Sequence, residues 1–147
     1  MQTMTAVEAH ALVEREAQEK ATPEVRDVRK TLVPGKVVRQ GDVYLVRVAE
    51  GKAMGGKEII ATGQLVDGTT RGSRHIAAGE GVTVYRDPLP RSALPECVRP
   101  DALLGPVIVA KVEFTVAPPE HAHVRCPAGK YQVIHQLDAA TRQRVQD

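Results

Sequence analysis

Apolar and polar residues alternate over short runs in most of the chain after residue 34. A period of two predicts β-strands, because successive side chains of a strand point to opposite faces of a sheet. Turn residues, chiefly Gly, Pro and Asp, separate the runs. The predicted strands are Val37–Val38, Val43–Val48, Glu58–Val66, Thr69–Ile76, Val82–Tyr85, Val107–Val116, Val124–Cys126 and Lys130–Gln136. Many short strands at even spacing predict a mainly β fold, either an antiparallel β-sandwich or a small barrel of jelly-roll type.

The segment from Pro106 to Gln136 is the most apolar part of the chain and contains the longest predicted strand, Val107–Val116. Pro118-Pro119 ends this strand, and Pro127-Ala128-Gly129 forms a turn before Lys130–Gln136. We expect the two long strands to form the central hairpin of the core, with the inward side chains Ile108, Val112, Phe114, Tyr131 and Val133.

The first 34 residues have a different pattern, with no glycine before Pro34. Thr5-Ala6-Val7-Glu8 matches a capping box, and good helix formers predict a helix over Ala6–Ala21 that Pro23 ends. Its apolar stripe is narrow and mostly alanine, so the helix packs at the periphery of its own domain or needs a partner surface.

Glu24–Leu32 is charged and is compatible with a second short helix or an extended arm. Pro34-Gly35 interrupts the pattern, and we place the domain boundary there. The sequence thus predicts a helix and arm over residues 1–34 and a β-domain over residues 35–147.

The stretch Arg86–Gly105 contains four prolines, and Pro106 follows it directly. Because proline has no amide donor, this stretch cannot pair inside a sheet, and we expect a long surface loop. Loops of this length in small domains usually carry function or contact a partner.

The composition suits a single globular domain of 147 residues with 42% hydrophobic residues. Aromatic residues make up only 3%, so the core must be aliphatic, and stacking platforms for carbohydrate or single-stranded nucleic acid are not expected. The net charge of +2 gives no strong attraction to nucleic acid or to an anionic membrane.

No apolar run approaches the roughly 20 residues of a membrane span, and the N-terminus lacks the pattern of a signal peptide. We therefore expect a soluble protein made in a reducing cytoplasm. The two cysteines, Cys97 and Cys126, lack metal-type spacing and are either two reduced thiols or a disulfide.

A histidine cluster is the sharpest chemical hypothesis. His75, His121 and His123, joined by Glu120 or Cys126, would supply the nitrogen, oxygen and sulfur ligands that zinc prefers. The alternative is that these are ordinary surface or hydrogen-bonding histidines, and we predict no metal site or cofactor.

No catalytic arrangement stands out, and we predict that the protein is not an enzyme. Ser73 lies near His75 but has no GxSxG context and no evident orienting acid. Asp42 is isolated in the sequence, and Glu113 is expected to be exposed. The glycine-rich loop Glu50–Lys57 lacks the phosphate-binding pattern.

Arginines in or beside loops form the other candidate feature. They are either solvated charges or groups that dock onto an acidic protein surface, because arginine pairs with carboxylates through two hydrogen bonds. These residues are Arg71, Arg74, Arg86, Arg91 and Arg99.

Four segments in order carry a family resemblance. They are RQGDVYLVRV (39–48), GTTRGSRHIAAGEGVTVY (68–85), PPEHAHVRCPAGKYQVIHQ (118–136) and RQRVQD (142–147). The chain resembles a family of small β-proteins of bacteria and tailed phages with a QGDV strand, a TGHxH segment, an HxEH segment and a PxGxY turn. Of the first histidine pair only His75 is present, and in Ala117–His121 the first histidine is missing, whereas His123 is additional.

The resemblance to phage-encoded proteins, together with the predicted arm and loop, implies a structural virion protein. The expected role is a capsid cement or decoration protein on the virion surface, made in the host cytoplasm, that stabilises contacts between major capsid subunits. It would act as a homodimer or homotrimer through many weak contacts, without membrane or specific nucleic-acid partners. The alternative is a bacterial metal- or small-ligand-binding β-domain that uses the histidine cluster.

Overall fold

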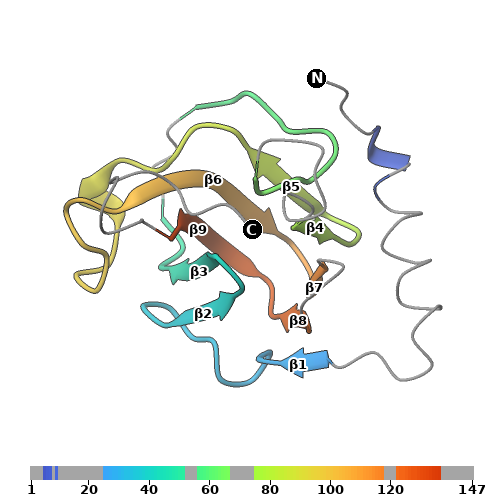
Figure 1. The fold of residues 1–147 in the computed structure, drawn as a ribbon, viewed down its shortest axis with the longest axis horizontal. Coiled ribbons are helices and arrows are strands. Elements are labelled where there is room, and N and C mark those ends of the chain that lie inside the picture. Colours follow the sequence, from blue (N-terminus) through green and yellow to red (C-terminus); the bar gives the residue numbers. More distant parts are fainter. Residues whose placement is uncertain are drawn as a thin grey trace.

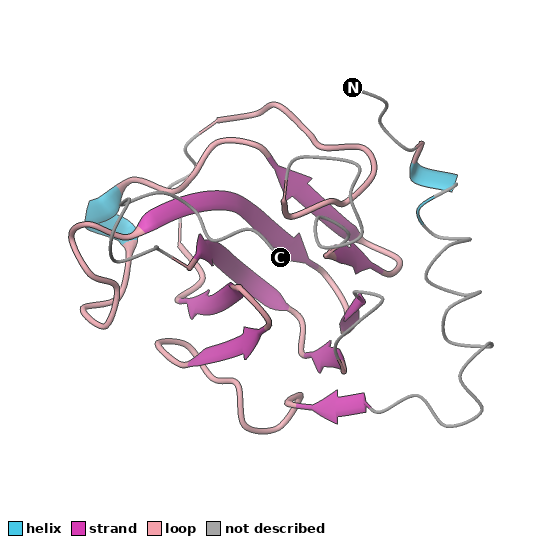
Figure 2. Ribbon diagram, in the orientation of Figure 1, coloured by secondary structure: helices cyan, strands magenta, loops and turns pink. Residues whose placement is uncertain are grey.

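The computed structural model of the protein describes residues 5–7, 9, 25–51, 56–66, 75–117 and 122–136. This part of the chain is mainly β, with one sheet of five strands in the order β2-β3-β9-β6-β5 and one of four in the order β1-β8-β7-β4 (Figures 1 and 2). The strands are β1 Val25–Asp27, β2 Val37–Gln40, β3 Val43–Val48, β4 Ile76–Ala78, β5 Val82–Tyr85, β6 Leu103–Ala110, β7 Phe114–Ala117, β8 His123–Cys126 and β9 Gly129–His135.

All neighbours in the five-stranded sheet are antiparallel, whereas the four-stranded sheet contains one parallel pair, β1 with β8. The two sheets do not close on each other, so the predicted small barrel is wrong. In the described part of the chain, no helix has the length and hydropathy of a membrane span.

The main apolar core receives side chains from both sheets. Leu45, Ile108 and Tyr131 come from the five-stranded sheet, and Phe114 and Val124 from the other. The rings of Phe114 and Tyr131 meet edge to face with centroids 5.3 Å apart. The Tyr131 hydroxyl donates a hydrogen bond to the Pro127 carbonyl at 2.7 Å, which satisfies its polar end.

The predicted strand Val107–Val116 is two strands in different sheets. The chain bends at residues 111–113, leaves the five-stranded sheet after β6 and enters the four-stranded sheet as β7. Val112 lies in this bend and is 49% exposed, so its predicted place in the core is wrong. The prediction that Ile108 and Tyr131 face the core is confirmed, and the two residues lie opposite each other on β6 and β9.

The predicted strand Glu58–Val66 is also wrong as a regular strand. It makes only two isolated bridges, Ile59 with Tyr85 and Gln64 with Ile76. The backbone turns at Gly63, whose φ of 74° favours glycine, and a Cβ there would lie 2.6 Å from the Ala77 carbonyl oxygen. The segment therefore runs from the edge of β5 to the edge of β4.

The N-terminal region is described only in part, and most of the predicted helix Ala6–Ala21 lies outside the described residues. Ala6, Val7 and Ala9 are helical, and Ala9 is buried in a small apolar cluster with Ile76. Residues 25–34, which the sequence pattern assigns to the arm, contribute strand β1 and the core side chains Val28 and Leu32.

An exposed ion-pair network ties β1 to the bend after β6. Arg29 contacts Asp27 at 2.8 Å and Glu113 at 3.0 Å, and Arg125 on β8 contacts Glu113 at 3.2 Å. Hydrogen bonds from Arg29 lower the pKa of Asp27 from 3.8 to about 2, and they lower the pKa of Glu113 as well. Glu113 is exposed, as the sequence predicted.

Replacement of Leu32 by alanine tests whether the segment before residue 35 belongs to the core. Leu32 is 3% exposed, so Leu32→Ala should lower the free energy of unfolding by about 2–4 kcal/mol. The neighbouring Val33 is 46% exposed, and Val33→Ala should change it by less than about 0.5 kcal/mol. Urea unfolding followed by circular dichroism measures both values, and equal losses would contradict the assignment.

The network also predicts an acid dependence of stability. Because the pKa of Asp27 is lower in the folded state, its contribution is present above pH 3.8 and is lost as the pH falls to about 2. Stability of the Asp27→Asn variant should therefore fall less steeply than that of the wild type across this window. The exposed Glu80, changed to Gln, serves as the control. Urea unfolding midpoints measured at several pH values test this prediction. Parallel curves of midpoint against pH for the wild type and Asp27→Asn would contradict the expected role of Asp27.

Candidate functional site

The proline-rich stretch predicted as a surface loop covers part of the outer face of the five-stranded sheet. Leu89 is buried there against Val48 and Val107. Consequently β6 is buried on both faces, with Val107 outward and Ile108 inward, which explains its nearly continuous apolar sequence. We call residues 86–102 the excursion.

The buried side chain of Gln132 on β9 fastens the excursion to the sheet. Its amide oxygen accepts a hydrogen bond from the Leu89 backbone N–H at 2.9 Å, and its amide nitrogen donates to the Gly105 carbonyl at 2.8 Å. The register of β6 against β9 shifts between Leu104 and Val107, around Pro106, where the missing amide would otherwise break the ladder. A polar side chain thus joins the start of the excursion to the first part of β6, which follows it.

The second half of the excursion is closed by Arg91. Its guanidinium donates to the carbonyls of Ala102 at 2.9 Å and Arg99 at 3.4 Å. The loop therefore keeps a defined shape above the sheet although it contains only a short 3-10 turn, Arg91–Ala93.

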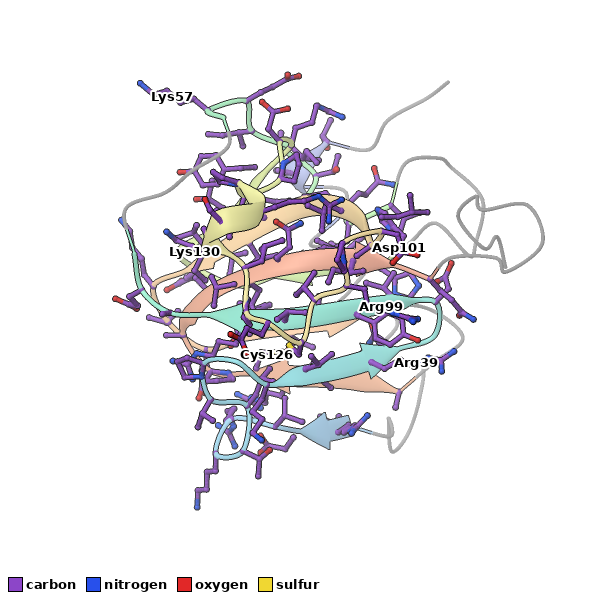
Figure 3. All side chains as sticks on the ribbon, turned by 90° about the vertical axis from the view of Figure 1, so that its left-hand side faces the viewer. Arg39, Lys57, Arg99, Asp101, Cys126 and Lys130 are labelled. Carbon is purple, nitrogen blue, oxygen red and sulfur yellow. The ribbon has the colours of Figure 1, made fainter. Side chains whose placement is uncertain are left out.

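A groove of about 550 Å³ lies between residues 97–103 and the outer faces of β2, β3 and β9. This volume is in the range of small-ligand and peptide side-chain sites. Polar groups also border it, among them Arg99, Asp101 and His135 (Figure 3 labels the first two). Its apolar lining is formed by Val37, Tyr44, Val46, Val98, Leu103 and Ile134.

Arg39, at the turn end of β2, is the best-positioned exposed cation beside this groove. Its Nε donates to the Gly41 carbonyl at 2.7 Å, and one Nη donates to the Gln136 amide oxygen at 3.1 Å. Its guanidinium carbon lies 5.4 Å from the centre of the Tyr44 ring, at cation–π distance. Sequence reasoning missed this residue, although it opens the RQGDV segment.

A buried polar network joins the two sheets on the opposite side of β2. The Gln40 amide nitrogen donates to the carbonyls of Val116 at 2.9 Å and Ala122 at 2.8 Å, at the end of β7 and just before β8. The Gln40 amide oxygen faces Nδ1 of His75 at 3.1 Å, and Nε2 of His75 lies 3.2 Å from Oδ1 of Asp42. Gln40, Asp42 and His75 are all buried.

The orientation of Gln40 has a consequence for the proton on His75. Two carbonyls accept from the Gln40 nitrogen, so the Gln40 oxygen is an acceptor and His75 Nδ1 must carry hydrogen. Nε2 of the same ring lies 3.2 Å from Oδ1 of Asp42, a distance at which a protonated ring would pair with the carboxylate. The network therefore brings a buried histidine and a buried carboxyl group together.

The structure shows the surroundings of two of the predicted histidines, and both are buried. His75 is occupied by Gln40 and Asp42, and His123 is buried on β8. His121, like Glu120 and Ser73, lies outside the described residues. Among the residues that the structure describes, no group of three or more His, Cys, Asp or Glu side chains has the geometry of a metal site. Asp42, isolated in the sequence, is thus the buried partner of a histidine.

The two cysteines are separate free thiols. Cys126 is buried in the core, and burial raises the pKa of its thiol to about 12, so it is neutral near pH 7. Cys97 is exposed on the excursion beside the groove and lies 3.6 Å from the Gly35 carbonyl oxygen.

The loop arginines have different surroundings. Arg86 pairs with Glu58 at 3.0 Å, and Arg91 closes the excursion. Arg99 is exposed at the groove, and its guanidinium makes no hydrogen bond to the described part of the chain. Arg71 and Arg74 lie outside that part.

The fold and the groove define a class: a two-sheet β-protein whose proline-rich excursion forms a groove on one outer face. The chain belongs to the family described as a domain of unknown function, DUF8820, whose model matches residues 39–136. The match begins at Arg39 and ends at Gln136, so it contains the groove strands β3 and β9, the excursion and the Gln40–Asp42–His75 network. No curated protein and no solved structure matches the chain.

Removal of the Gln40 amide tests the network. Gln40→Leu leaves one buried carbonyl, one partly buried carbonyl and the His75 N–H without this partner, so the free energy of unfolding should fall by about 2 kcal/mol or more. Gln136→Leu, which removes only the acceptor of one exposed arginine, should cost less than about 1 kcal/mol. Urea unfolding measures both variants. A loss for Gln40→Leu no larger than for the control would show that the network does not hold the sheets together.

Proposed function

We propose that the protein is a structural interaction protein, a β-sandwich of jelly-roll type that attaches to the surface of a larger protein assembly. The observation that carries the proposal is the groove roofed by the excursion, with Arg39 held in place beside it. Defined loops on a rigid sheet are typical of binding surfaces, because the scaffold bears the cost of ordering them in advance.

The specific form that we propose is a capsid cement or decoration protein of a tailed phage. The resemblance of the RQGDV, HxEH-like and PxGxY-like segments to phage-encoded proteins favours this form. The sandwich, with its N-terminal helical arm, would bind across neighbouring major capsid subunits on the virion surface. Individual contacts would be weak, and their number on a symmetric shell would make attachment firm. A homodimer or homotrimer of this chain would match such symmetry.

Purified particles test the proposal directly. Virions are prepared from the phage or induced prophage whose genome encodes the chain, and the chain is quantified by mass spectrometry against the major capsid protein. We expect a fixed ratio of small integers, and recombinant protein should rebind to particles made without it. Its absence from the particles, or its presence in traces only, would overturn the proposal.

Elemental analysis of the purified protein addresses the histidine-cluster alternative. The proposal predicts no stoichiometric zinc or iron, whereas one metal ion per chain would favour a metal-binding domain. Light scattering after size exclusion gives the oligomeric state in the same preparation.

A further inference from the structure

The groove beside Arg39 has the chemistry of a site for a particular kind of peptide. Its apolar floor is formed by side chains of three adjacent strands, with Val37 on β2, Val46 on β3 and Ile134 on β9. Such a surface takes aliphatic side chains, whose burial contributes about 25 cal/mol per Å². The apolar floor alone does not determine which peptide binds. The charged groups at the border of the groove determine it.

Arg39 is oriented before any partner arrives. Two of its five N–H groups are used by Gly41 and Gln136, and the guanidinium stacks on Tyr44, which itself lines the groove. The remaining donors belong to an exposed, fixed guanidinium. The planar N–H donors of a guanidinium match the two oxygens of a carboxylate. Little side-chain entropy is lost on binding, because the side chain of Arg39 is already held.

A second cation and one acid border the same groove. Arg99 is exposed on the excursion side, and Asp101 follows it two residues later. Together with Arg39 the balance is two guanidinium charges, of which that of Arg39 is held in place, against one carboxylate. This excess favours an acidic group on the occupant and disfavours a basic one.

We propose that the groove binds an extended acidic–aliphatic peptide segment of the partner assembly, with a carboxylate on Arg39 and the adjacent aliphatic side chains on the Val46–Ile134 floor. The inference rests on the proposed function for the identity of the partner, but not for the chemistry of the site. The excursion supplies the opposite wall, so the segment lies between Arg99 and the sheet.

Binding of short peptides tests the site on the full chain. The probe is the acetylated, amidated pentapeptide Val-Leu-Glu-Val-Asp at millimolar concentration, followed by amide chemical shifts of the ¹⁵N-labelled protein. We expect chemical-shift changes at the backbone amides of Val37, Tyr44, Val46 and Ile134. The Gln/Asn counterpart of the peptide should bind at least about tenfold more weakly, since it lacks the charge-assisted hydrogen bonds.

Two variants examine the two halves of the site. Arg39→Gln should weaken the acidic peptide at least about tenfold and leave the Gln/Asn peptide nearly unchanged. Ala102→Phe, which places a ring in the groove, should weaken both peptides. The matched control is Lys57→Gln, an exposed charge outside the groove lining, which should alter neither. Proton spectra of each variant confirm that the fold is kept.

Several outcomes would overturn the inference: no shifts at millimolar peptide, shifts elsewhere on the surface, equal binding of acidic and neutral peptides, or normal binding by Arg39→Gln. Failure of the groove inference can be distinguished from failure of the proposed function. If virions contain the protein and Arg39→Gln and Ala102→Phe still attach normally, the groove inference fails and the cement role stands. If the peptide binds as expected and virions lack the chain, the groove stands and the cement role fails.

Discussion

The contact on which the two-sheet arrangement depends is the buried amide of Gln40. It is the point where β2 of one sheet is hydrogen-bonded to the backbone of the other, through the carbonyls of Val116 and Ala122. Apolar packing between sheets is not directional, and a core of aliphatic side chains tolerates small slides. A buried amide with fixed partners does not, because each displaced bond leaves an unpaired polar group. His75 and Asp42 extend this constraint from β2 to the start of β4.

Gln132 makes comparable buried hydrogen bonds on the outer face of the five-stranded sheet. Its side chain connects the Leu89 amide to the carbonyl of Gly105, and so it holds the start of the excursion against the sheet. The groove lies beneath the second half of the excursion, which Arg91 closes. The protein thus uses two buried glutamines, one to align its sheets and the other to shape its surface.

The sequence predicts the regular strands well where the period of two is bounded by turn residues. Val43–Val48 and Val82–Tyr85 are observed with the predicted bounds. The split between β6 and β7 could not be seen, because Lys111-Val112-Glu113 continues the alternation through the bend. Strand β1 was missed because three residues, Val25–Asp27, carry too short a pattern to be distinguished from a charged arm.

The site was harder to predict than the fold. Asp42 and His75 are 33 positions apart, and only the packing of one sheet on the other brings them together. Arg39 shows no sign in the sequence of its ring contact with Tyr44 or of its bond to Gln136, which lies 97 positions away. The proline content of the excursion did indicate a loop, but not that Leu89 would bury its side chain on the sheet.

The place of β9 at the centre of the five-stranded sheet has a consequence for how the protein folds. β9 lies between β3 and β6, and Val43 pairs with His135, 92 positions later. Closing so long a loop is entropically costly and slows folding relative to local pairing. During synthesis the β2–β3 hairpin and β6 must therefore wait with open edges until β9 emerges from the ribosome. Nascent chains would be most prone to mispairing during that interval.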